Sequence, residues 1–212
     1  MIKTEKLNIS SEIRASAIEG IHDPEMWLKE ESDQISTLIV GRNKPGNLNY
    51  NGRTTHGRTH WSFHEDNDAA RTISDIIFST IICNKQEWTT DQVWGAAYNK
   101  GDYAQTHTHG KNRISWVYYL SCCNNCAPLL LEEAESEEAS AHYDHLYDEK
   151  ALMGYTRNLF HAKEIIPETN LLVYFNSEVV HEVPEHKCNH ERIILAGNVS
   201  KDSKMMSWEE AY

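Results

Sequence analysis

The feature that most constrains the fold is a series of short β-rich segments that starts near Val93. Each segment is rich in branched and aromatic residues and is bounded by turn residues, which is typical of strands in a β domain. The candidate strands are 93–98, 103–109, 114–120, 129–131, 171–175 and 193–196. Many short strands in one region predict a closed or double-layered β architecture.

The region before these strands, residues 1–90, predicts a mainly helical elaboration that packs on a core at 91–212, the two forming one structural domain. A helix is expected over about 67–83, behind a cap at Asp66 or Asn67, because apolar residues recur there at helical spacing. A second candidate helix lies around 22–39. An acidic insertion at 132–162 interrupts the strands, and is either a solvated excursion or a lid over a binding site.

Bulk composition is that of an ordinary globular enzyme. The chain has 212 residues, 40% of them hydrophobic, and a formal charge of −12. This charge argues against nucleic acid or an anionic membrane as a partner, because phosphate binding needs basic patches. No apolar run approaches a membrane span, and five cysteines, an odd number, favour a reducing compartment. We therefore expect a cytoplasmic protein whose oligomeric state the sequence leaves open.

A histidine motif lies within the β region. His107 and His109 are two residues apart, so on a strand they point the same way and can reach one metal ion. His181 can complete a facial triad with them. Arg192 follows eleven residues later and indicates a carboxylate-bearing co-substrate, which a guanidinium binds through paired hydrogen bonds.

The order of these residues resembles the Fe(II)- and 2-oxoglutarate-dependent oxygenases, especially the prolyl-hydroxylase-like branch and related oxygenases of bacteria and phages. The resemblance covers roughly residues 93–198. It rests on Tyr98, the Gly101-Asp102-Tyr103 turn, His107-Thr108-His109, Tyr118-Tyr119-Leu120, His181-Glu182-Val183-Pro184 and Arg192. It implies a mainly β fold with flanking helices, namely a double-stranded β-helix (jelly roll, cupin-like) with N-terminal helices.

The resemblance also implies an activity: hydroxylation of a small molecule or an amino-acid side chain with Fe(II), 2-oxoglutarate and O₂, releasing succinate and CO₂. His107 and His181 would be the histidine ligands of iron, and Arg192 would bind the distal carboxylate of 2-oxoglutarate. Tyr98, Tyr119 and Ser115 would line the co-substrate pocket.

One position departs from the family pattern. The second residue of the motif is usually Asp or Glu, whereas here it is His109. A neutral imidazole ligand would leave the site with one less negative charge and weaken Fe(II) binding without co-substrate. If His109 does not bind iron, an open coordination position results instead. We expect it to bind, because histidine is not small.

Two other readings stay open. Gly101 and the His-x-His pair match the opening of a cupin signature, which would give a three-histidine dioxygenase or isomerase without 2-oxoglutarate. The glutamate expected after the second histidine is absent, however, and Arg113 and Ile114 stand there. A non-catalytic metal- or ligand-sensing barrel is the other reading, since fold does not determine activity.

The cysteines form a separate motif. Cys123 and Cys126 are spaced as Cys-x-x-Cys, and Cys188 with His190 could in principle complete a zinc site. The spacing is not that of a zinc finger, and free thiols on a loop are the expectation.

Overall fold

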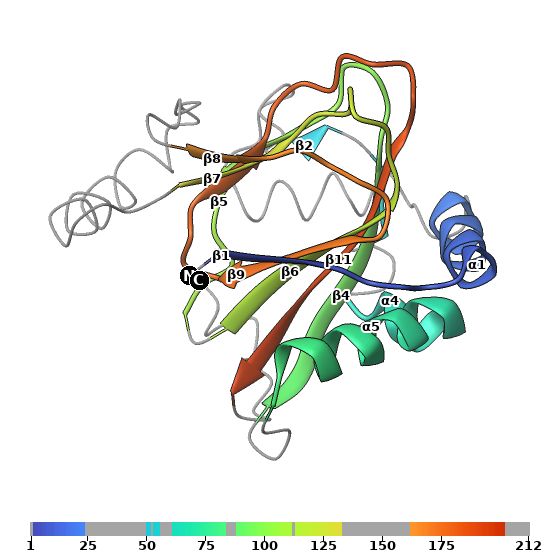
Figure 1. Cartoon of the computed structure of the whole chain (residues 1–212), viewed down its shortest axis with the longest axis vertical. Coiled ribbons are helices and arrows are strands. Elements are labelled where there is room, and N and C mark those ends of the chain that lie inside the picture. Colours follow the sequence, from blue (N-terminus) through green and yellow to red (C-terminus); the bar gives the residue numbers. More distant parts are fainter. Residues whose placement is uncertain are drawn as a thin grey trace, which may run out of the picture.

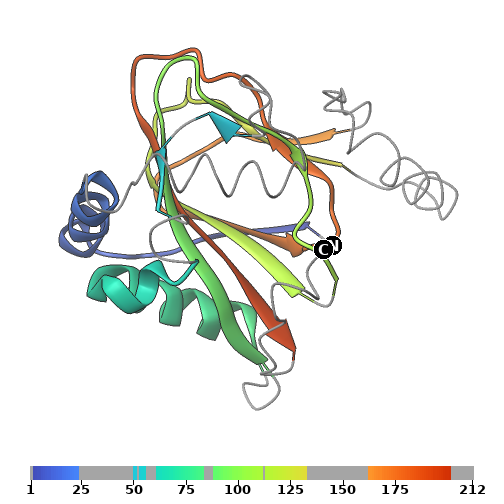
Figure 2. The ribbon, with the colours of Figure 1, turned by 180° about the vertical axis from the view of Figure 1, so that it is seen from behind.

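Two antiparallel sheets face each other, and helices cover the outer side of one of them (Figures 1 and 2). The computed structural model describes residues 2–23, 50–51, 53–55, 61–83, 88–111, 113–132 and 162–201. In order, the six-stranded sheet contains β1 (Ile2–Lys6), β9 (Leu171–Asn176), β6 (Arg113–Ser121), β11 (Arg192–Lys201), β4 (Trp88–Tyr98) and β3 (Arg53–Thr54). The five-stranded sheet contains β2 (Tyr50–Asn51), β5 (Tyr103–His107), β10 (His181–Val183), β7 (Leu129–Glu132) and β8 (Ala162–Ile165).

Helices α1 (Ser11–His22), α4 (Phe63–Asp66) and α5 (Asp68–Ile81) lie along the outer face of the six-stranded sheet (Figure 1). The expected helix at 67–83 is confirmed as α5. Its N-cap is Asn67, whose Oδ1 accepts a hydrogen bond from the Ala70 amide at 2.8 Å. Ile73 and Ile77 of α5 are fully buried against the sheet.

Strand β6 shows how the alternating sequence builds two cores. Trp116, Tyr118 and Leu120 belong to the cluster shared with the helices. Val117 and Tyr119 point the other way, into the cluster between the two sheets. Because successive strand residues point to opposite faces, one apolar strand serves both layers. The face that holds Tyr119 is the one that can line an interior site.

The central strand β11 continues this arrangement. It pairs antiparallel with β4 on one side, where Arg192 lies opposite Tyr98, and with β6 on the other, where Ile194 lies opposite Tyr119. Ile194 and Ala196 belong to the core between the sheets. Arg192 has the same parity as these residues, so it lies on the inner face of the strand.

The N-terminal region differs in part from the expectation of a mainly helical elaboration. Three of its described elements, β1, β2 and β3, are strands, and β1 pairs with β9 over its whole length. The segment therefore extends both sheets as well as covering one of them. The second candidate helix, at 22–39, and the acidic insertion at 132–162 lie almost entirely outside the described residues.

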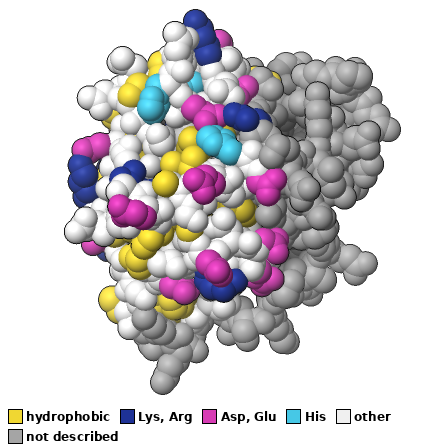
Figure 3. All heavy atoms as spheres, turned by 90° about the vertical axis from the view of Figure 1, so that its right-hand side faces the viewer, with side chains coloured by type: hydrophobic (Ala, Val, Ile, Leu, Met, Phe, Trp, Pro, Cys, Tyr) yellow, Lys and Arg dark blue, Asp and Glu magenta, His cyan; other side chains and the backbone are white. Residues whose placement is uncertain are grey.

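The face of the molecule in Figure 3 is mixed. Acidic side chains are scattered over it, with basic and hydrophobic ones between them, and the acidic ones are in keeping with the charge of −12. In the described part of the chain, none of the helices combines the length and the apolar character that crossing a membrane would need.

Candidate metal centre

Two of the three histidines of the motif face each other across paired strands. His107 is the last residue of β5, and His181 is the first residue of β10. The two residues are direct partners in the antiparallel register, and their ring centroids are 4.2 Å apart. This neighbourhood joins residues 74 positions apart in the sequence, and it depends on the register of the five-stranded sheet.

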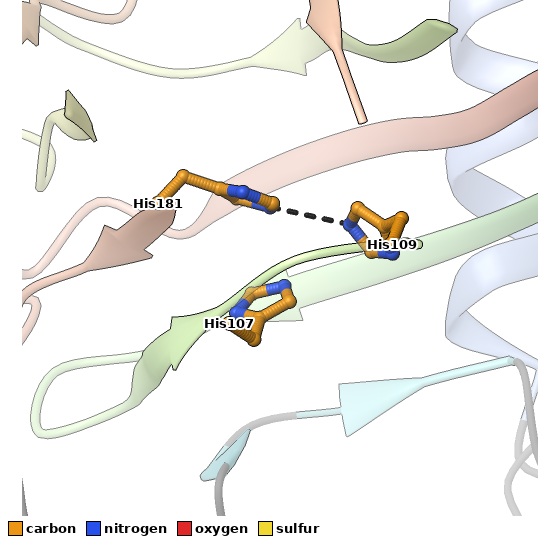
Figure 4. A group of neighbouring side chains, drawn as sticks. All are labelled: His107, His109 and His181. Carbon is orange, nitrogen blue, oxygen red and sulfur yellow. Dashed lines mark hydrogen bonds between the residues drawn. The ribbon is translucent and has the colours of Figure 1, made fainter. Parts of the chain in front are cut away.

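His109 reaches the same place from a loop, which corrects the expectation that it shares a strand with His107. Strand β5 ends at His107, and residues 108–110 have no regular structure. Figure 4 shows the His109 ring turned toward His181, with the His107 ring close to both. The ligand atoms of the three histidines all lie within 4.8 Å of one another.

The loop that carries His109 is held in place by hydrogen bonds. The His109 amide donates to the carbonyl of Ser177 at 2.9 Å, and Arg113 Nη1 donates to the His109 carbonyl at 3.2 Å. The hydroxyl of Ser177, which is buried, donates to the carbonyl of Gly110 at 2.7 Å. Arg113 is itself paired with Asp91, 2.8 Å from Nε to Oδ2. These contacts hold His109 close to β10 without a strand.

The geometry of the ring nitrogens suits one metal ion. Nε2 of His109 and Nε2 of His181 are 3.2 Å apart. Two nitrogens bound to one metal at about 2.1 Å lie roughly 3.0–3.4 Å apart in octahedral or tetrahedral sites. His181 Nδ1 lies 2.9 Å from the Val179 carbonyl oxygen, so this nitrogen carries the proton and Nε2 keeps its lone pair. The residues present therefore fit a metal ion.

The charge state of the rings also favours metal binding. Burial lowers the pKa of His181 well below its usual value, and the neighbouring His107 and His109 lower it further. Burial likewise lowers the pKa of His109, with further contributions from His107 and Arg113. Both rings are therefore neutral near pH 7, which is the form that binds a metal. Within the described residues, this group of donor atoms includes no carboxylate.

Aromatic side chains outside the sequence motif pack around the histidines. Trp94 of β4 lies against His109, with ring centroids 5.5 Å apart, and Trp61 meets Trp94 edge to face at 4.9 Å. Phe175 of β9 packs against His181 at 4.9 Å. The alternation along β4 places Trp94 on the inner face with Tyr98, so the sequence could have indicated that Trp94 lies near the site. No local pattern connected Trp61 or Phe175 to the histidines.

Arg192 lies on the same inner surface, fully buried. Its guanidinium carbon lies 4.8 Å from the centre of the Tyr98 ring and 5.1 Å from that of Tyr119. Nη2 donates to the Tyr119 hydroxyl at 3.5 Å. Burial raises the pKa of Tyr119, and the positive charge of Arg192 opposes this only in part, so the phenol stays protonated. The structure thus brings together three residues expected to bind the co-substrate.

The last of the expected site residues, Ser115, lies elsewhere on the inner face. Its hydroxyl donates to Asn198 Oδ1 at 2.7 Å, and Asn198 Nδ2 donates to Gln92 Oε1 at 2.7 Å. Asn198 is six residues along β11 from Arg192, roughly 20 Å at the rise of a strand. Ser115 of β6 therefore lies beside the end of β11 that is far from Arg192. Its place in the co-substrate pocket stays a prediction. Sequence reasoning missed Asn198 and Gln92.

Replacing His109 with aspartate tests its role as a ligand. We expect His109→Asp to bind Fe(II) at least as tightly as the wild type, because a carboxylate adds negative charge beside the metal and lies near Arg113. His109→Ala should bind iron more weakly than either. The measurement is an anaerobic Fe(II) titration without co-substrate. An aspartate variant that folds but binds iron no better than the alanine variant would show that this position does not contact the metal.

The sequence matches the model of one protein family. Residues 92–198, just over half of the chain, match the family described as "Putative 2OG-Fe(II) oxygenase". This span runs from β4 to β11 and contains all three histidines and Arg192. No curated protein matches the sequence.

Three solved structures share the fold at low sequence identity. A prolyl hydroxylase from Trichoplax adhaerens, in complex with a hypoxia inducible factor peptide fragment, has a TM-score of 0.56 at 15% identity, covering 96% of this chain and 84% of that one. The viral collagen prolyl hydroxylase of Paramecium Bursaria Chlorella virus-1, a 2OG complex, has a TM-score of 0.52 at 12% identity, with coverages of 95% and 96%. HygX from Streptomyces hygroscopicus with iron bound has a TM-score of 0.54 at 9% identity, with coverages of 95% and 83%.

These likenesses confirm the double-stranded β-helix with flanking helices that the resemblance implied. The histidine cluster supplies the donors that iron requires, and the family match extends over the strands that carry it. The chain belongs to the 2OG-Fe(II) oxygenase family and is an oxidoreductase that uses Fe(II) and 2-oxoglutarate.

Proposed function

We propose that this protein hydroxylates a small molecule or an amino-acid side chain, with release of succinate and CO₂. The observation that carries the proposal is that the three histidines and the buried Arg192 border one interior surface of the β core. Trp94, which contacts His109, and Tyr98, which contacts Arg192, lie on the same face of β4. They are four residues apart, roughly 13 Å along a strand.

Each residue has a distinct part in this proposal. The neutral rings of His107, His109 and His181 would hold Fe(II). Arg192 would bind the distal carboxylate through two parallel hydrogen bonds, and the Tyr119 phenol could donate another. When bound, iron and 2-oxoglutarate would activate O₂, which is the oxidant: one of its oxygen atoms enters succinate as the keto acid loses CO₂, and the other ends in the product hydroxyl. Trp94 and Phe175 would exclude water around the metal.

The hydrogen-bonded row of Ser115, Asn198 and Gln92 supports a polar substrate. Gln92 lies two residues beyond Trp94 on β4, on the side away from Tyr98. A substrate bound there would approach the metal from the side opposite the co-substrate. Asn198 already has partners for both ends of its amide within this row, so half-buried Gln92, whose Oε1 accepts from Asn198, is the member whose amide group could donate to a neutral polar group of a substrate. A peptide or amino-acid amide has the matching chemistry.

The experiment that tests the proposal is an anaerobic titration of the metal-free protein with Fe(II) and then 2-oxoglutarate. We expect a visible metal-to-ligand charge-transfer band, because the keto acid binds iron through two oxygen atoms. A screen of small polar molecules and amino-acid derivatives for succinate release then follows. If iron binds but no band forms, the chain does not bind 2-oxoglutarate as proposed, and the three-histidine cupin chemistry takes its place. His22→Ala, which removes an exposed histidine outside the cluster, serves as the control.

A further inference from the structure

A second cluster of metal-binding side chains lies outside the histidine centre. Cys123 and Cys126 lie in the turn that follows β6, and Cys188 lies between β10 and β11. The fold brings these segments together although they are more than 60 residues apart. The three sulfur atoms form a nearly equilateral triangle, with Sγ to Sγ distances of 3.7 Å, 3.7 Å and 3.8 Å. The thiols are free, as expected, but the fold brings three of them together at one place.

The size of this triangle is that of a metal site. In a tetrahedral site with zinc to sulfur distances of about 2.3 Å, two thiolates lie roughly 3.8 Å apart, as the geometry of a tetrahedron requires. A disulfide would instead need two of the sulfurs at about 2.05 Å and would exclude the third. All three cysteines are free thiols. The equal spacing of three sulfurs thus favours a shared ion over a covalent pair.

The backbone around the cysteines is already arranged for a shared ion. The Cys126 amide donates to the Cys123 carbonyl at 3.0 Å, which closes a tight turn. The Cys123 amide donates to Cys126 Sγ at 3.2 Å. The carbonyl of His190 lies 3.4 Å from Cys188 Sγ and 3.8 Å from Cys126 Sγ. The amide donor favours the thiolate form of Cys126, which is the form that binds a metal, whereas the contacts with the His190 carbonyl belong to protonated thiols and would be given up as the ion enters.

Two histidines lie near enough to be considered as the fourth ligand. His186 is buried, its Nδ1 accepts from the Ala127 amide at 3.1 Å, and its Nε2 donates to the His190 carbonyl at 2.7 Å. Both of its ring nitrogens therefore already have partners within the fold, although Nε2 also lies 3.5 Å from Cys188 Sγ. His190 is exposed, and its Nε2 lies 3.3 Å from the Ser121 hydroxyl. With its ring turned toward the sulfurs, His190 would complete a Cys₃His set.

We propose that Cys123, Cys126 and Cys188 bind a structural zinc ion, with His190 as the fourth ligand. Binding involves no redox change, and the thiols release their protons as the ion enters. The ion would join the end of β6 to the segment between β10 and β11, which follows Val183 and ends at Arg192. It would thereby hold β10, which carries His181, in place relative to β11, which carries Arg192. This inference does not depend on the proposed hydroxylation.

Cobalt substitution of the wild-type protein tests the site directly. Thiolates bound to Co²⁺ give an intense near-ultraviolet charge-transfer band, which histidine nitrogens do not give. We expect this band to reach the intensity of one thiolate-bound Co²⁺ per chain, to which any Co²⁺ held by the histidine cluster adds nothing, and to disappear when Zn²⁺ is added. If cobalt binds without a thiolate band, or if all five thiols react with a thiol reagent in the native protein without release of metal, the proposal is overturned.

Variants then identify the ligands. Cys188→Ser should lose one equivalent of zinc per chain, measured by elemental analysis after purification, whereas the neighbouring Cys122→Ser should keep it. Cys122 is the matched control because its amide and thiol contact Thr169 instead of the cluster. His190→Ala should shift the visible cobalt spectrum, whereas an unchanged spectrum would remove His190 from the set. The wild-type cobalt titration keeps the test decisive even if Cys188→Ser does not fold.

Discussion

His181→Ala is expected to abolish Fe(II) binding and, with it, turnover. The orientation of the His181 ring is fixed by its other nitrogen, which donates to the Val179 carbonyl. Loss of an outer hydrogen-bonding partner alone typically costs roughly 10–100-fold in metal affinity, and loss of the ligand itself costs more. The measurement is iron bound per chain after anaerobic equilibration, followed by succinate release. We expect both values to fall to the background of metal-free protein.

The control for this variant is His22→Ala, which removes an exposed histidine that pairs with Glu191. Thermal unfolding of each metal-free variant separates loss of the ligand from loss of the fold. A His181→Ala protein that keeps its iron and its activity would contradict the assignment of the cluster as the catalytic metal centre.

The second large effect is expected at Arg192, where replacement by alanine should raise the KM for 2-oxoglutarate. A hydrogen bond to a charged group contributes about 1.5–3 kcal/mol, which corresponds to roughly a 10- to 150-fold weaker interaction when it is lost. The guanidinium is fully buried between Tyr98 and Tyr119, so little water is present to replace it. Steady-state succinate release at varied 2-oxoglutarate gives the KM, and Fe(II) binding without co-substrate should be unchanged.

Arg192→Lys is the matched variant, because it keeps the positive charge but loses the planar fork that binds a carboxylate at two points. Its KM should lie between those of the wild type and of Arg192→Ala. An unchanged KM in a folded alanine variant would remove Arg192 from the co-substrate site and leave it as a structural cation.

The expectations that held are those that depend on short-range periodicity. Runs of branched and aromatic residues bounded by turn residues predicted the central strands β4, β6, β9 and β11, and apolar residues at helical spacing predicted α5. Alternation along β6 then places Tyr119 and Trp116 on opposite faces of the strand. These patterns are readable because each strand or helix must bury one face of its own sequence.

The expectations that failed involve where a regular element ends. The run at 103–109 continues the strand pattern, yet β5 stops at His107. The reason is tertiary: the amide of His109 is bound by the Ser177 carbonyl, and its carbonyl is bound by Arg113. The contact with Ser177, in the turn at 177–180, takes the place of further strand pairing after His107. No residue within the motif indicates this contact.

By itself, the sequence determined the β-rich architecture, the identity of the three histidines and of Arg192, and the absence of a carboxylate at position 109. Only the tertiary structure decided that His109 reaches the cluster from a loop, that Trp94 and Phe175 pack against the cluster, and that Cys188 meets Cys123 and Cys126. The physical reason is range. Periodicity and residue chemistry act within a few positions, whereas these contacts join segments tens of residues apart, and the register of paired strands sets them.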